Sequence, residues 1–144
     1  MTQQDVATLV SELDQARAGL YALLRSKDAG AFAKRPASDE WSIVENVRHL
    51  LFAEQLHLGK FLPDGFEWSR LGLTQRTGRT FADVGKDPTE DLEKVFQAWD
   101  AVHQPIREAV KGGDRDAQKA LDRHLKHLVH HINIIEKLLS ESSA

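Results

Sequence analysis

The chain has 144 residues, a formal net charge of -3 at pH 7 and seven histidines, but no cysteine. This length fits a single domain over residues 1–144, and the missing cysteines exclude disulfides, thiolate zinc sites and a cysteine nucleophile. The charge is spread without a basic block and no apolar run could cross a bilayer, so we expect a soluble cytoplasmic protein that binds neither nucleic acid nor membranes.

Apolar residues recurring with a helical period predict the first two elements as amphipathic helices. The first helix runs from the N-terminal residues to about Ser26. A connection with several helix-breaking residues follows. Ser42 and Glu45 then form an S-x-x-E motif, which is typical of a helix start, and the second helix runs from there to about Phe61.

Residues 62–87 form a long connection with scattered glycines and no sustained period, as is typical of functional or mobile loops. Asp87 is then placed to cap a third helix, which ends at the pair Gly112–Gly113. The fourth helix begins near Asp114 and continues to about Ser140. Four amphipathic helices without a strand predict an all-α fold, a four-helix bundle.

Four histidines lie on the fourth helix, at residues 124, 127, 130 and 131. His127 and His131 are one turn apart, so they lie about 40° and about 6 Å from one another and both rings can reach one ion. The alternative is a pair of half-buried or surface histidines that holds no ion. His124 lies at the edge of the same apolar stripe, whereas His130 points towards water.

A catalytic zinc site often combines three protein ligands with an open position, so this pair needs a third donor. The candidates are His49, His57 and His103. If the second and fourth helices are antiparallel, His49 lies level with the pair, but if they are parallel the offset is about 15 Å.

The long second connection can return the length of the bundle, and the two-glycine break makes the third and fourth helices antiparallel neighbours. Both features favour an up-down-down-up topology, in which His49 meets His127 and His131. In the competing up-down-up-down topology His103 lies level with His49, and the pair on the fourth helix stands alone. The favoured topology leaves His103 as a core histidine that needs a hydrogen-bond partner, and His57 at the surface.

Two segments carry a family resemblance: WSIVENVRHLLFAE, residues 41–54, and HLVHH, residues 127–131. They resemble the Trp-Ser-x-x-Glu-x-x-x-His-Leu and His-x-x-x-His motifs of the DinB/YfiT superfamily, and the helix lengths are similar over nearly the whole chain. The resemblance implies an up-down-down-up bundle, a divalent ion held by His49, His127 and His131, and a homodimer. Many members follow the last ligand with Arg-Gly-Gln, whereas this chain has Ile-Asn-Ile at residues 132–134.

Characterised relatives include metal-dependent transferases and isomerases that use low-molecular-weight thiols such as bacillithiol or mycothiol. The resemblance therefore implies a metal-dependent transfer of such a thiol to a small electrophile. The alternatives are a metal-dependent hydrolase and a non-enzymatic, metal-stabilised binding or stress-response module. Three imidazoles and a water suit zinc, nickel, iron, copper or manganese, so the residues do not select the ion.

Four further residues are candidates for the chemistry. Glu45, one turn before His49, could orient a ligand, and His124 could shuttle protons at the edge of the pocket. Arg76 and Arg79, late in the long connection, could bind the carboxylates of a thiol cosubstrate. The simpler roles are helix capping for Glu45, a half-exposed position without function for His124, and solvation for the two arginines.

Overall fold

The computed structural model describes residues 6–26, 32, 42–63 and 92–142. Throughout these ranges the chain is helical or in short turns, and it contains no strand. The described ranges hold four α-helices and one short 3-10 helix: α1 (Val6–Arg25), α2 (Ile43–Leu58), η2 (Gly59–Phe61), α4 (Leu92–Lys111) and α5 (Arg115–Ser142). The predicted all-α fold is confirmed, while the cap expected at Asp87 lies outside the described residues.

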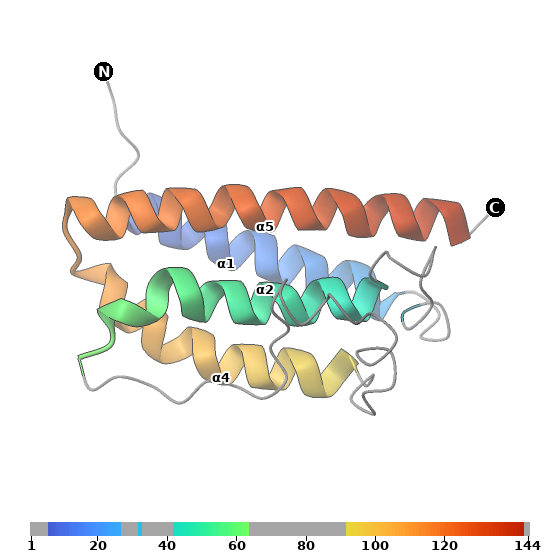
Figure 1. Ribbon diagram of the computed structural model, residues 1–144, viewed down its shortest axis with the longest axis horizontal. Coiled ribbons are helices and arrows are strands. Elements are labelled where there is room, and N and C mark those ends of the chain that lie inside the picture. Colours follow the sequence, from blue (N-terminus) through green and yellow to red (C-terminus); the bar gives the residue numbers. More distant parts are fainter. Residues whose placement is uncertain (1–5, 27–31, 33–41, 64–91, 143–144) are drawn as a thin grey trace, which may run out of the picture.

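The helices form a bundle with up-down-down-up topology (Figure 1). α1 and α5 run in one direction along the long axis, and α2 and α4 run in the other. α5 packs against α1 and α2, and α4 packs against the same two helices from the other side. The predicted topology is confirmed. The expectation that α4 and α5 are packed neighbours is wrong, because these antiparallel helices lie diagonally across the bundle.

α2 begins with the capping box that its S-x-x-E motif predicts. The Ser42 hydroxyl accepts the N–H of Glu45 at 3.2 Å, and the Glu45 carboxylate accepts the N–H of Ser42 at 2.9 Å. These bonds satisfy two amides that a helix start leaves unpaired. The N–H of Val44 also donates to the carbonyl of Phe32 at 3.0 Å. The start of α2 is therefore fixed, and with it the height of His49 along the bundle.

The break between α4 and α5 depends on Gly113 rather than on both glycines. The N–H of Gly113 donates to the carbonyl of Val110 at 2.9 Å. A Cβ at Gly113 would collide with the Cβ of Ala117 and lie 2.9 Å from the Val110 oxygen, whereas a Cβ at Gly112 would meet nothing within 4 Å. The turn therefore needs a residue without a side chain at position 113.

The apolar stripes of all four helices meet in one core around the fully buried Trp99. Each fully buried leucine in this core stabilises the fold by about 1.5–3 kcal/mol. α2 is covered on most of its surface, and even its polar residues Arg48 and Glu54 are buried. Leu56 is 54% exposed, because it lies nearly opposite the buried Leu58 on the helix and faces outwards.

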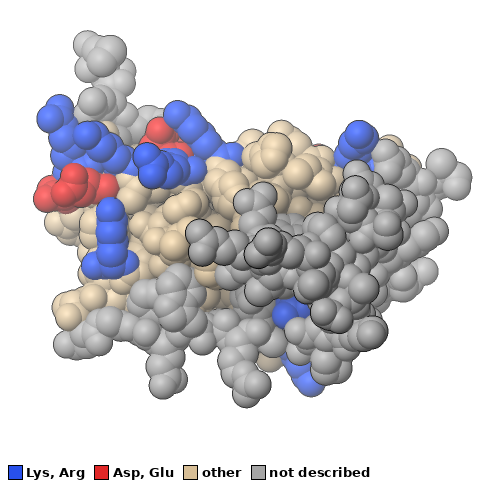
Figure 2. Space-filling view, viewed as in Figure 1, with Lys and Arg blue, Asp and Glu red and all other residues tan. Residues whose placement is uncertain are grey.

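None of the described helices is both long and apolar enough to span a lipid bilayer. On the face seen in Figure 2, Lys and Arg side chains gather with Asp and Glu at the end of the molecule where α4 is followed by α5. Residues without charge fill the described part of the upper middle of this face. Charges of both signs are thus mixed at one end of the bundle.

Candidate metal centre

Three histidines come together on the side of the bundle formed by α2 and α5, and we call them the first histidine cluster. His49 comes from α2, and His127 and His131 come from successive turns of α5. Their ring centroids are 4.5, 4.9 and 5.1 Å apart, and each ring offers one nitrogen within 4.8 Å of the others. The antiparallel packing of α2 and α5 thus brings together the three residues predicted as ligands, in a group that could hold a metal ion.

The tautomer of His131 is set by Asn46, a residue that sequence reasoning missed. The amide nitrogen of Asn46 donates to the carbonyl of Ser42 at 2.9 Å, so its oxygen faces His131 and accepts from Nδ1 at 2.8 Å. The proton of neutral His131 therefore sits on Nδ1, and Nε2 carries the lone pair. That Nε2 lies 3.1 Å from Nε2 of His127. Asn46 thus aims a metal-binding nitrogen into the first histidine cluster.

Burial keeps His127 and His131 in the protonation state that a metal ligand requires. Burial and then the neighbouring imidazoles lower the pKa of His127 to about 4 and that of His131 to about 3. Both rings are therefore neutral at pH 7 and retain a free lone pair. Because a histidine ring binds a metal only in its neutral form, these two ligands do not have to lose a positive charge before they bind.

Two other histidines lie elsewhere than predicted. His124 is fully buried rather than half-exposed, and His57 is half-buried rather than at the surface. Their Nδ1 atoms are 3.2 Å apart, so the two rings face each other across the contact between α2 and α5. The apolar stripe of α5 could not reveal this burial, because α2 covers the edge of that stripe. His130 is exposed, as expected, and the proton-transfer role of His124 stays a prediction.

The remaining candidate residues are Glu45, Arg76 and Arg79. Glu45 is buried, and its carboxylate serves the capping box at the start of α2. This structural role accounts for its position one turn before His49, and its role in orienting a ligand stays a prediction. Arg76 and Arg79 lie outside the described residues.

A buried carboxylate, Glu54 of α2, lies behind the histidines and was also missed. Its Oε1 accepts the indole N–H of Trp99 at 3.0 Å, and its Oε2 lies 2.7 Å from Nδ1 of His103. Nε2 of His124 lies 3.5 Å from Oε1. Burial alone would raise the pKa of Glu54, but the hydrogen bond from His103 and the nearby His124 outweigh it and lower that pKa. Glu54 is therefore a charged group inside the bundle.

His103 is the core histidine that the sequence predicts, and both of its ring nitrogens make hydrogen bonds. Besides Glu54, it contacts Oδ1 of Asp14 through Nε2 at 2.8 Å. Although burial lowers the pKa of His103, its bonds to the two carboxylates raise the pKa above the ordinary value. A protonated His103 can donate to Glu54 and Asp14 at once. It thereby supplies positive charge to the buried Glu54 carboxylate.

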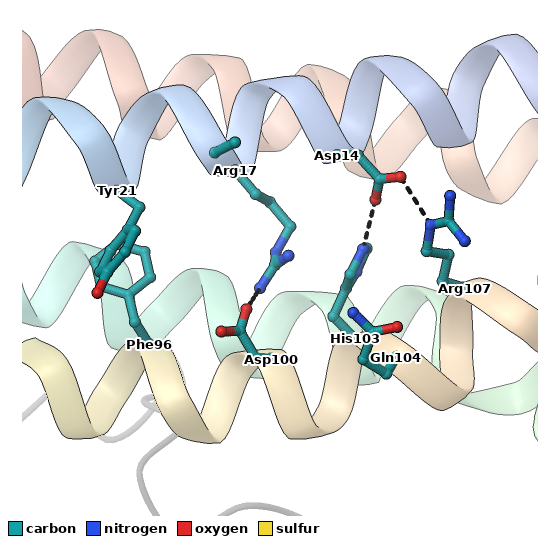
Figure 3. A pocket seen from close by; sticks show the side chains of 9 residues that line it. Asp14, Arg17, Tyr21, Phe96, Asp100, His103, Gln104 and Arg107 are labelled. Atoms are coloured by element: carbon teal, nitrogen blue, oxygen red, sulfur yellow. Dashed lines mark hydrogen bonds and ion pairs between the residues drawn. The ribbon is translucent and has the colours of Figure 1, made fainter.

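A surface cavity of about 450 Å³ lies between α1 and α4, opposite the side of the bundle that carries the first histidine cluster. Figure 3 shows that its charged side chains pair with one another. Asp14 accepts hydrogen bonds from His103 and, at 2.7 Å, from Nε of Arg107. Arg17 donates to Asp100 at 2.7 Å. These pairs join α1 to α4. The cavity is lined by structural ion pairs, whereas convergent nitrogen donors lie on the histidine side.

The comparisons with known proteins agree with this architecture. A sequence profile of the DinB superfamily matches residues 12–135, which is most of the chain. No curated protein and no solved structure matches significantly. Because the matched range contains α2, α4, most of α1 and the part of α5 that carries the histidines, the predicted relationship is confirmed: the chain belongs to the DinB superfamily.

Proposed function

We propose that the protein is a divalent-metal-dependent enzyme that transfers a low-molecular-weight thiol to a small electrophile. The ion would be held by His49, His127 and His131. The class of cosubstrate, a thiol of the bacillithiol or mycothiol type, comes from the family resemblance. A homodimer in the cytoplasm is part of the same proposal.

The observation that carries the proposal is the convergence of ring nitrogens from α2 and α5 in the first histidine cluster. The donor group around His49 contains three residues, and within the described ranges no carboxylate joins it. Structural zinc sites are closed by four protein ligands, whereas catalytic sites keep a position for water or substrate. Three imidazole ligands therefore support a catalytic rather than a purely structural ion.

The residues around the cluster support this chemistry by holding the ligands. Asn46 fixes the Nε2 lone pair of His131, and burial keeps His127 and His131 neutral. A divalent ion bound there lowers the pKa of a thiol or water that it contacts, which supplies a nucleophile at neutral pH. Arg76 and Arg79 are proposed to bind the carboxylates of the thiol.

The test compares the wild-type protein with His49→Ala, after zinc, nickel, iron(II) or manganese loading. Conjugation of bacillithiol, mycothiol or glutathione to an activated aryl chloride is followed by absorbance. We expect metal-dependent conjugation by the wild type and its loss in His49→Ala. His130→Ala is the matched control, because it removes an exposed histidine from the same part of α5.

Three other outcomes would contradict the proposal. Ester or amide hydrolysis without thiol transfer would identify a metal-dependent hydrolase. Bound metal without turnover of any thiol or ester would favour a binding module. Full conjugation activity in His49→Ala would exclude the first histidine cluster as the catalytic site.

A further inference from the structure

A second group of three histidines lies one to two turns along α5 from the first cluster. His57 of α2 and His124 of α5 join His127 to form what we call the second histidine cluster, in which each ring offers one nitrogen within 4.8 Å of the others. The ring centroid of His57 lies 5.4 Å from that of His124 and 5.7 Å from that of His127. The geometry therefore resembles that of the first cluster, and His127 belongs to both.

Two nitrogens of the second cluster, Nε2 of His124 and Nδ1 of His127, are buried without a hydrogen-bond partner among the described residues. The Nδ1 atoms of His57 and His124 face each other at 3.2 Å, and either one proton or one shared cation can occupy such a contact. His127 directs Nε2 at His131, while none of the described residues offers a hydrogen-bond partner to its buried Nδ1. Because an unpaired buried nitrogen costs free energy, this atom needs an explanation. A cation between the three rings would provide one.

Glu54 gives the second cluster the support that metal-binding histidines usually have. Nε2 of His124 is buried without a good hydrogen bond and lies 3.5 Å from the Glu54 carboxylate. A small movement would let this N–H donate to Glu54 and leave Nδ1 free for an ion. Such a carboxylate behind the ligand fixes the tautomer and strengthens the histidine as a ligand. Among the described residues, the positive charge nearest to Glu54 is that of His103, which also contacts Asp14, so a cation held by His124 would add to the balance of the buried Glu54 charge.

We propose that His57, His124 and His127 form a second site for a divalent transition-metal ion. His127 joins the two sites, binding the ion of the first cluster through Nε2 and that of the second through Nδ1. When both sites are filled, His127 releases its remaining ring proton to solvent. Zinc, cobalt, nickel and copper suit three imidazole donors.

The test measures the zinc content of the folded protein by native mass spectrometry and elemental analysis. We expect two ions per chain in the wild type, and one in His57→Ala and in His49→Ala. The exposed control His130→Ala should retain two. Circular dichroism verifies that each variant keeps its helix content.

The same variants separate this proposal from the proposed function. A single ion that survives His57→Ala but not His49→Ala overturns the second site and leaves the catalytic proposal intact. A single ion that survives His49→Ala but not His57→Ala supports the second site and removes the basis of the catalytic proposal.

A second measurement does not depend on how the variants fold. Wild-type crystals grown with zinc should give two anomalous peaks, one beside His49 and His131 and the other beside His57 and His124. A single peak at the first cluster, with His57 and His124 still paired, would overturn the second site.

Discussion

Replacing Asn46 by leucine tests whether a residue that touches no ion controls the metal site. Leucine has the same branched shape, with bulkier methyl groups, but it cannot accept the Nδ1–H of His131, which Asn46 now accepts at 2.8 Å. Loss of such a supporting bond weakens metal affinity by about 10–100-fold. This range corresponds to about 1.4–2.7 kcal/mol of binding free energy. The metal-free protein should also lose about 1–3 kcal/mol of stability, because the buried N–H of His131 is left without an acceptor.

Zinc affinity would be measured by competition with a chromophoric chelator, in a His57→Ala background so that only the first histidine cluster is titrated. Asn46→Asp should bind zinc at least as tightly as the parent, because a carboxylate still accepts from Nδ1. Asn133→Leu, the same change at an exposed position on α5, should have no effect. An unchanged zinc affinity in Asn46→Leu, with native helix content, would refute the proposed role of this bond.

Three further predictions concern stability. Gly113→Ala should lower the free energy of unfolding by about 1–3 kcal/mol in urea, because its Cβ meets Ala117 and the Val110 oxygen, whereas Gly112→Ala should not. Glu54→Leu should cost about 3–5 kcal/mol by the same measurement, since it leaves His103 charged and buried without its main acceptor, while the change Glu108→Leu at an exposed site should stay within about 0.5 kcal/mol. The metal-free protein should melt at a lower temperature at pH 5 than at pH 7. The reason is that burial lowers the pKa of His57 and His127 to about 4 and that of His131 to about 3. As the pH falls below about 6.5, the unfolded chain therefore takes up protons before the folded protein does, and the folded state loses stability. The raised pKa of His103 has the opposite effect, because the stability that it contributes is lost only above about pH 6.5. An equal or higher melting temperature at pH 5 would contradict this account.

The sequence predicted the bundle well because its signals are local. Helical periodicity located the helices, the S-x-x-E motif located the start of α2, and the length of the second connection favoured the up-down-down-up topology. Each of these signals lies within one helix or one connection. The predicted contact between α4 and α5 failed because a short turn sets the direction of a helix but not which neighbours it packs against.

The sequence revealed less of the site because the missing residues act through contacts between helices. His57 and His124 were placed towards the surface, since each lies outside or at the edge of its own apolar stripe. Asn46 and Glu54 were not singled out, because polar residues are normally exposed. A signal existed for Glu54: it shares one face of α2 with Leu50 and Leu58, both of which are buried. A carboxylate on such a stripe indicates a buried partner on another helix.

The hydrogen bonds around Glu54 also bear on how the chain selects one alignment of its helices. From α2 this carboxylate reaches α4 directly and α5 at 3.5 Å, and through His103 it is linked to Asp14 of α1. Leucine side chains can repack after one helix slides along another, but a buried charge cannot find a substitute partner. Slippage of any helix by a single turn, about 5.4 Å, would strand an ionised group in an apolar interior. Misaligned bundles are thereby penalised, whether or not a metal is bound.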